Sequence, residues 1–205
     1  MIFKVMNLEQ STTAALDPRG AEEQENCTPR DDERITALAR NAVEAYVLRG
    51  RVIEPPHFPE TSALGRPSAC FVCIKTVGRE LRGCIGTVEP EYATLAEEVI
   101  ANAVKAATRD PRFRPVTGDE LSSLLYSVDV LGIPEPARFE DLNPAHFGVV
   151  VTDRSGSRRG LLLPDIESIE TAGQQVGVAA RKAGIKPGEP LRLYRFRTRR
   201  FKESA

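Results

Sequence analysis

The sequence is poor in the residues that are typical of metal-binding and membrane proteins. It has two histidines, four cysteines and no tryptophan in 205 residues, and no apolar run approaches membrane-spanning length. His57 and His146 both lie in loop-like stretches, so a structural zinc site is disfavoured and we expect no metal. Lys and Arg together number 28 against 29 Asp and Glu, which leaves a formal charge of −1. A chain with this balance has no global field that would attract nucleic acid or a membrane surface.

Sequence motifs of the common enzyme classes are also missing. The chain has no nucleophile elbow, Walker loop, dinucleotide fingerprint or His-Glu-x-x-His motif, and we predict no cofactor. The segment Gly156-Ser157-Arg158-Arg159-Gly160 is rich in glycine, but it lies between two predicted strands rather than before a helix. It is most simply a hairpin turn.

The first eight residues show neither the apolar core nor the cleavage site of a signal peptide. We therefore expect a cytoplasmic protein whose cysteines are free thiols. Cys70 and Cys73 have the spacing of a redox or zinc motif, but they lie within a strand-like run and should point to opposite faces. The simpler interpretation is that both are small buried hydrophobes.

Two parts of the chain differ in composition. Residues 1–30 are rich in Glu, Gln, Thr and Pro and predict a mobile acidic leader, with an edge strand at residues 2–5 as an alternative. Residues 31–205 carry periodic apolar patterns and predict one domain. The order of hairpins and helices indicates an α+β fold with a mainly antiparallel sheet. The expected helices begin at Asp31, span residues 95–108 and begin again at Thr171; the expected strands are 70–76, 81–86, 124–131, 147–151, 159–163 and 191–201.

The segment Leu81-Arg82-Gly83-Cys84-Ile85-Gly86 is the best candidate for chemistry. Alternation along a strand places Arg82 and Cys84 on one face. A cation beside a thiol lowers the pKa of the thiol and increases its thiolate fraction. The opposing interpretation is a buried cysteine and an arginine paired with a carboxylate, and spacing alone does not decide between the two.

The C-terminal strand is basic. Arg195, Arg197 and Arg199 fall on one face of a continuous strand at residues 191–201. This pattern is typical of the charged outer face of an edge strand. A phosphate-binding comb is the alternative, but the exposed aromatic residues of single-strand binders are lacking, so we do not expect nucleic acid as a partner.

With these segments identified, the chain resembles the AMMECR family, which includes the Alport-syndrome and elliptocytosis critical-region protein. The specific match is Leu81–Gly86, and the resemblance covers about residues 32–201. The chain departs from the usual pattern at Cys70 and Cys73, where small or hydroxyl residues are expected. The supporting motifs are Asp110-Pro111-Arg112-Phe113, Arg159-Gly160-Leu161-Leu162-Leu163-Pro164 and Arg181-Lys182-Ala183-Gly184.

The resemblance implies two unequal lobes with the signature strand near a cleft between them. It implies no established activity, but it does imply Memo-like and radical-SAM partner proteins and a place as protein A of their uncharacterised modification system. Under this hypothesis Cys84 is a nucleophile or covalent carrier and Arg82 binds an anion or favours the thiolate. Arg109, Asp110 and Arg112 are then candidate binding residues, with Asp110 orienting the guanidinium groups.

The alternative hypothesis is a non-catalytic adaptor for protein partners. In that case the glycines of the signature allow close approach of other segments, and Cys84 is merely packed. The sequence supplies no general base for the cysteine, so whether the chain is an enzyme stays open.

Overall fold

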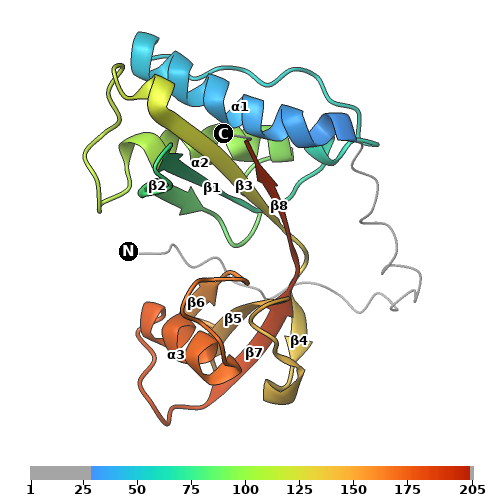
Figure 1. The fold of residues 1–205 in the computed structure, drawn as a ribbon. Helices are drawn as coiled ribbons and strands as arrows, with labels where there is room; N and C mark the ends of the chain where they lie inside the picture. Colours follow the sequence, from blue (N-terminus) through green and yellow to red (C-terminus); the bar gives the residue numbers. More distant parts are fainter. Residues whose placement is uncertain (1–28, 204–205) are drawn as a thin grey trace.

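The structure is a computed structural model that describes residues 29–203. Nearly all of the predicted leader, including the alternative strand at residues 2–5, lies outside the described residues. The described chain forms two lobes, which lie one above the other in Figure 1. Lobe one comprises residues 29–131 and 198–203, and lobe two comprises residues 132–197.

Lobe one is a four-stranded antiparallel sheet with two helices on one face (Figure 1). The strand order is β2-β1-β3-β8, so β2 and β8 are its edges. Side chains alternate along β1 and β3, and those that face the helices form the core, such as Val72, Ile74 and Val128. The elements are α1 (Pro29–Arg49), β1 (Cys70–Thr76), β2 (Leu81–Gly86), α2 (Leu95–Thr108), β3 (Leu124–Leu131) and β8 (Thr198–Lys202).

Lobe two is a second four-stranded antiparallel sheet with one helix. The strand order is β4-β7-β5-β6, and α3 packs on the face of β5 that carries Val149 and Val151. The middle strand β5 is buried along its whole length, as its run of valines predicts. The elements are β4 (Glu135–Ala137), β5 (Gly148–Asp153), β6 (Arg159–Leu162), α3 (Ala172–Lys182) and β7 (Leu191–Phe196).

Lobe two is inserted between two neighbouring strands of lobe one. The chain leaves lobe one at the end of β3 and returns at the start of β8, where Leu131 is paired with Thr198. The Gly132 N–H donates to the carbonyl of Arg197 at 2.8 Å, which ties the two crossings together. The prediction of one continuous strand at residues 191–201 is therefore wrong, because the chain changes sheets at Arg197.

A small apolar interface joins the lobes. Val150 and Phe196 lie on the face of the second sheet that α3 does not cover, and they belong to one buried cluster with Leu131. Phe71 on β1 packs against the same cluster. Since Phe71 alternates with the core residue Val72, this contact identifies the outer face of the first sheet as the face toward lobe two.

Local signals in the sequence predict several element ends correctly. Thr94 with Glu97 and Thr171 with Gln174 form capping boxes at the starts of α2 and α3. Gly184 follows α3 with a φ of +68°, as expected for a residue that ends a helix. The fold class is α+β and mainly antiparallel, as predicted. Within residues 29–203 none of the helices combines the length and apolarity needed to cross a bilayer.

Candidate functional site

Cys84 on β2 and Cys73 on β1 lie directly opposite each other and form a disulfide, with their Cα atoms 4.1 Å apart. The expectation that all the cysteines are free thiols is therefore wrong for this pair. Cys73 is also half-buried rather than a buried hydrophobe. Cys70 is a free thiol sealed in the core of lobe one, and the two cysteines of the Cys-x-x-Cys spacing do face opposite ways. Burial raises the pKa of the Cys70 thiol far above its usual range.

The disulfide lies on the outer face of the first sheet, the face toward lobe two. Gly83, the neighbour of Cys84, faces α2, because a Cβ placed on it would meet the carbonyl oxygen of Ala106 at 2.3 Å. Alternation then turns Cys84 away from the helices. Cys73 is turned the same way, since its neighbours Val72 and Ile74 are core residues.

The backbone of Cys84 is held by the loop that follows α2. The Cys84 N–H donates to the Asp110 carboxylate at 2.9 Å, and Arg112 donates to the Cys84 carbonyl at 3.4 Å. Arg112 also makes contacts of 2.6 and 2.9 Å with the same carboxylate. Asp110 and Arg112 thus occupy the place that a further strand would take at the edge of β2.

Hydrogen bonds from the Arg112 side chain, with smaller contributions from the N–H groups of Cys84 and Arg112, lower the pKa of Asp110 to about 2. Partial burial acts in the opposite direction and raises the pKa, but its effect is smaller. Asp110 is only 4% exposed, and its carboxylate stays ionised over the neutral range. Asp110 therefore holds the Arg112 guanidinium in place, and it makes no such contact with Arg109 among the described residues.

Arg82 does not lie in regular alternation with Cys84. The pairing of β1 with β2 shifts at this point, because Ile74 lies opposite Gly83 while Lys75 lies opposite Leu81. Arg82 is the extra residue of this β-bulge.

The Arg82 guanidinium is engaged by the segment after α2. It donates to both oxygens of Glu120, at 2.7 and 3.0 Å, and to the carbonyls of Arg114 and Pro115. The hydrogen bond from Arg82 lowers the pKa of Glu120 to about 2. These contacts match the sequence-based alternative in which the arginine pairs with a carboxylate.

Arg109 lies apart from this arrangement. It is exposed at the end of α2, where its backbone N–H donates to the Lys105 carbonyl. The structure thus brings the backbone of Cys84 together with Asp110 and Arg112, while Arg82 and Arg109 occupy other positions.

A cation from lobe two was not predicted at this site. Lys182, at the end of α3, donates to the carbonyl of Leu161 on β6 at 3.4 Å. Partial burial lowers the pKa of Lys182, and the nearby Arg112 guanidinium lowers it further. An electrostatic effect of Arg112 on Lys182 thus couples one cation from each lobe across the junction. The motif that contains Lys182 is visible in the sequence, but its electrostatic coupling to Arg112 follows only from the fold.

The junction is also joined by an ion pair. Arg159, the first residue of β6, contacts Glu89 in the loop after β2. The Nε of Arg159 is buried and has no hydrogen-bond partner among the described residues. Gly160 follows, and a Cβ there would meet the carbonyl of Ala179 in α3 at 2.0 Å. The Arg-Gly pair at 159–160 repeats the arrangement at 82–83, where a glycine of an edge strand lets a helix backbone approach.

A buried polar group on α2 holds the loop after β2. The carboxylate of Glu98 is fully buried and accepts hydrogen bonds from Thr87 and from the N–H groups of Glu91 and Tyr92. Asn102, one turn later, donates to the Cys70 carbonyl at 3.1 Å. Sequence reasoning did not single out these residues; the signal was two polar residues four apart on an otherwise apolar helix.

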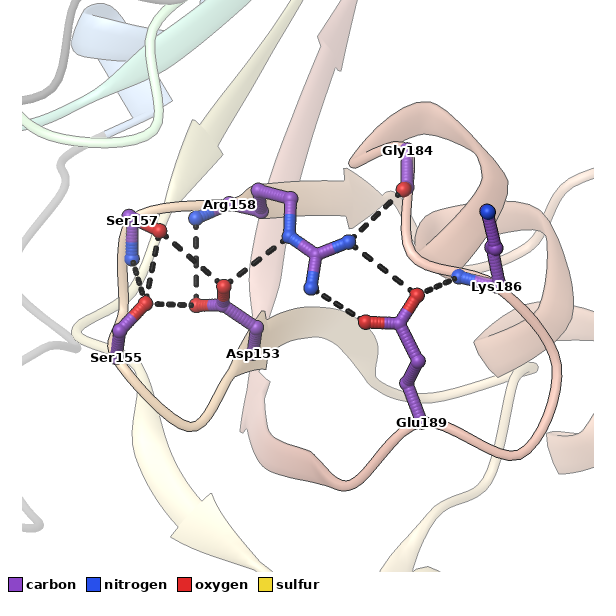
Figure 2. Close-up of polar contacts among 7 residues, drawn as sticks. All are labelled: Asp153, Ser155, Ser157, Arg158, Gly184, Lys186 and Glu189. Carbon is purple, nitrogen blue, oxygen red and sulfur yellow. Dashed lines mark hydrogen bonds and ion pairs between the residues drawn. The ribbon is translucent and has the colours of Figure 1, made fainter.

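A polar network braces lobe two at the turn between β5 and β6 (Figure 2). Arg158 contacts Asp153 at 3.1 Å, Glu189 at 2.5 Å and the carbonyl of Gly184. Hydrogen bonds from Arg158 and its neighbours hold the pKa of Asp153 well below its usual range despite desolvation. The glycine-rich segment is thus a braced hairpin turn, as predicted.

The C-terminal arginines do not form a single comb. Arg195 contacts Glu135 at 2.6 Å, and both Arg195 and Arg197 lie over the ring of Phe147. Arg199 lies in the other sheet, over the ring of Phe201.

Two open hollows lie near this part of the chain, and neither is lined by Cys84. One of about 580 Å³ is lined by His146, Arg197 and Lys202, among others, and one of about 470 Å³ lies between α1 and β8. Within residues 29–203 no group of three or more His, Cys, Asp and Glu side chains is placed to hold a metal ion.

Fold and junction together define a class of protein: a two-lobed α+β domain with an inserted second sheet and an arginine-glycine edge strand on each side of the junction. The AMMECR1 family profile matches residues 36–203, and the chain belongs to the AMMECR1 family. The resemblance drawn from Leu81–Gly86 is confirmed.

Relatives cover nearly the whole described domain. A protein of Thermotoga maritima is 43% identical over 166 residues, which is 80% of this chain and 94% of the relative. Protein CA_C1420 of Clostridium acetobutylicum is 41% identical over 176 residues, which is 85% of this chain but only 37% of that longer protein.

The crystal structure of the uncharacterized protein PH0010 from Pyrococcus horikoshii has the same fold. Its TM-score is 0.77 at 31% identity, covering 87% of this chain and 94% of that one.

Proposed function

We propose that this chain is the AMMECR component of a modification system with Memo-like and radical-SAM partners, and that its reactive group is the Cys84 thiol at the lobe junction. The partners are inferred from the family resemblance alone. The location is inferred from one observation. Arg82, Gly83 and Gly86 of the signature are occupied by contacts that serve the packing of lobe one, whereas Cys84, which is disulfide-bonded to Cys73, is half-buried on the sheet face toward lobe two.

The charges around Cys84 favour an anionic substrate. Arg112 is bound to the Cys84 carbonyl and half exposed, and Lys182 in lobe two is coupled to Arg112 electrostatically. The Asp110 carboxylate forms an ion pair with Arg112, and Lys182 adds a second cation from lobe two. Guanidinium and ammonium groups bind phosphate or carboxylate and also stabilise a nearby thiolate. The proposed role therefore combines a thiol with a cationic binding surface, and Arg82 supports it only through the fold.

The first test measures the reactivity of Cys84 in the reduced protein. Iodoacetamide at neutral pH should label Cys84 faster than an unperturbed thiol, whose pKa is about 8.5. Lys182→Gln should slow this labelling, while its exposed neighbour Arg181→Gln serves as the matched control. A rate equal to that of an unperturbed thiol in the reduced protein would remove the activated cysteine from the proposal.

The second test concerns the partners. The Memo-like and radical-SAM proteins encoded in the same genome should co-purify with the tagged chain, and Cys84→Ser should abolish any conversion that the mixture performs while leaving the complex intact. If neither protein binds, the proposed system is wrong for this chain.

A non-catalytic adaptor is the second candidate, and a specific observation favours it. Most of the signature serves the fold: Arg82 binds Glu120, Gly83 admits the backbone of Ala106, and the backbone of Cys84 is bound by Asp110. An adaptor predicts that partner binding survives Cys84→Ser and that no conversion depends on the thiol.

A further inference from the structure

We propose that Cys73 and Cys84 form a reversible two-electron couple, in which a dithiol reduces the disulfide and a disulfide oxidant restores it. Cys73 and Cys84 are direct partners in the β1–β2 ladder, 11 residues apart in sequence. Directly opposed residues have side chains close enough to meet without a change in the backbone.

Both strands are held in place independently of the disulfide. β1 is paired with β2 on one side and with β3 on the other, and its inward residues lie in the core. β2 is an edge strand, but Asp110 and Arg112 bind the backbone of Cys84 itself. The two sulfur atoms therefore stay opposed in either redox state, and the pair can open and close without unfolding the hairpin.

Burial separates this pair from the other cysteine of the lobe. Cys73 and Cys84 are half-buried on the outer face of the sheet, whereas Cys70 is fully buried among core residues. A disulfide exchanges with a thiolate only where that thiolate has access to sulfur. The pair is thus within reach of a dithiol, and Cys70 supplies an internal control within the same strand.

The exchange balances in two steps. A thiolate of the dithiol attacks one sulfur atom, so that the Cys73–Cys84 bond breaks and a mixed disulfide forms. The second thiolate of the dithiol then displaces the protein sulfur. The products are two protein thiols, which carry the two protons of the dithiol, and the cyclic disulfide of the reductant. Two electrons pass to the protein.

One consequence rests on the proposed function. In the oxidised state Cys84 has no thiol to offer, so a modification reaction that uses Cys84 is blocked until the pair is reduced.

The test equilibrates the full chain, carrying Cys27→Ser, in buffers of reduced and oxidised dithiothreitol. Acid quenching, alkylation and mass spectrometry then give the thiol fraction at each cysteine. We expect Cys73 and Cys84 to change together along a two-electron curve, identically from the reduced and the oxidised side, while Cys70 is constant. In Cys73→Ser the Cys84 thiol should be alkylated in every buffer, and in Cys84→Ser the Cys73 thiol likewise.

Different results overturn different claims. The couple is wrong if Cys73 and Cys84 change independently, or if both stay alkylatable in fully oxidised dithiothreitol while circular dichroism reports a folded protein. If the couple is observed but Cys84 in Cys73→Ser reacts with iodoacetamide only as an unperturbed thiol, the couple stands and the activated cysteine falls. If Cys84 reacts rapidly but no disulfide forms, the activated cysteine stands and the couple falls.

Discussion

The carboxylate of Asp110 accepts a hydrogen bond from the backbone N–H of Cys84 at 2.9 Å, and Arg112 holds that carboxylate in position. The N–H and carbonyl of Cys84 point outward from the sheet edge, where unpaired groups would invite another strand. Two motifs that α2 separates in the chain, at residues 81–86 and 110–113, thus meet at one edge of the first sheet.

Replacing Asp110 should therefore destabilise lobe one. Asp110→Ala removes a buried acceptor and leaves the Cys84 N–H unpaired, and we expect the free energy of unfolding to fall by about 3 kcal/mol. The urea midpoint of unfolding measures this loss. Arg109→Gln, one residue earlier and exposed, should change it by less than about 0.5 kcal/mol. Equal effects from the two changes would contradict a role for Asp110 at the edge.

The low pKa of Asp110 predicts how stability depends on pH. Its pKa in the folded protein is about 2, against an ordinary value of 3.8. A lowered pKa stabilises the fold above the unfolded value, and this contribution is lost as the pH falls from about 5 to about 2. Glu120, with a pKa of about 2, acts in the same direction. Urea midpoints measured across this range should decline less steeply in Asp110→Asn than in the wild type.

Arg82 should prove structural rather than chemical. Arg82→Lys keeps the charge but loses the two parallel contacts with Glu120, so we expect a loss of about 1–2 kcal/mol in the free energy of unfolding. In the Cys73→Ser background, the rate at which iodoacetamide labels Cys84 should stay within about twofold of the value with Arg82 intact. A large fall in that rate would return Arg82 to the reactive site. Arg79→Lys, in the turn of the same hairpin, is the matched control.

Gly83 should tolerate no side chain. In Gly83→Ala the new Cβ would lie 2.3 Å from the carbonyl oxygen of Ala106, and a backbone atom cannot move away cheaply. We expect a loss of about 3 kcal/mol or more in the free energy of unfolding. Gly78→Ala meets only a hydroxyl at 3.5 Å and should cost far less. Thermal unfolding of the two variants, measured side by side, makes the comparison, and similar melting temperatures would contradict it.

The brace around Arg158 predicts local rather than global effects. In Arg158→Gln the carboxylates of Asp153 and Glu189 lose their shared partner (Figure 2). The backbone N–H of Lys186, which donates to Glu189 at 2.7 Å, should then exchange severalfold faster with solvent. Hydrogen exchange in α2, in the other lobe, should be unchanged. Uniform acceleration over both lobes would instead indicate global destabilisation.

Helices and hairpins of this fold could be predicted from the sequence because their signals are local. The helix predicted at residues 95–108 is α2, and the strand predicted at 124–131 is β3. Apolar periodicity and capping residues act within a few positions of the elements they define. The three-residue strand β4 is not among the strands predicted from the sequence, because it contains Pro136, which a sheet tolerates only at an edge.

The disulfide could not be predicted because it depends on a one-residue shift. Opposite the signature, Ile74 pairs with Gly83 while Lys75 pairs with Leu81, so the ladder contains one extra residue at Arg82. Without this bulge Cys73 would lie opposite Gly83, and the sulfur atoms would be on different faces. The turn residues 77–79 do not reveal whether the shift occurs.

The electrostatic coupling of Lys182 to Arg112 and the change of sheet at Arg197 both depend on how the two lobes pack together. No sequence pattern around Lys182 or around Arg197 predicts how the lobes pack. The family resemblance supplied the two lobes and the location of the signature, but the resemblance carries no side-chain contacts. The side-chain contacts between the lobes, such as the packing of Val150 and Phe196 against Leu131, are visible only in the structure.

The insertion of lobe two has a consequence for the order of folding. Lobe two is contiguous in sequence, so all of its strand pairings close over fewer than about seventy residues and can form as soon as that segment is synthesised. The sheet of lobe one is complete only when β8 pairs with β3 across the whole of that inserted segment. Long loops of this kind raise the entropic cost of closure and slow folding. Lobe one, which carries the signature, is thus the last to complete its sheet, and lobe two can already be folded when this happens.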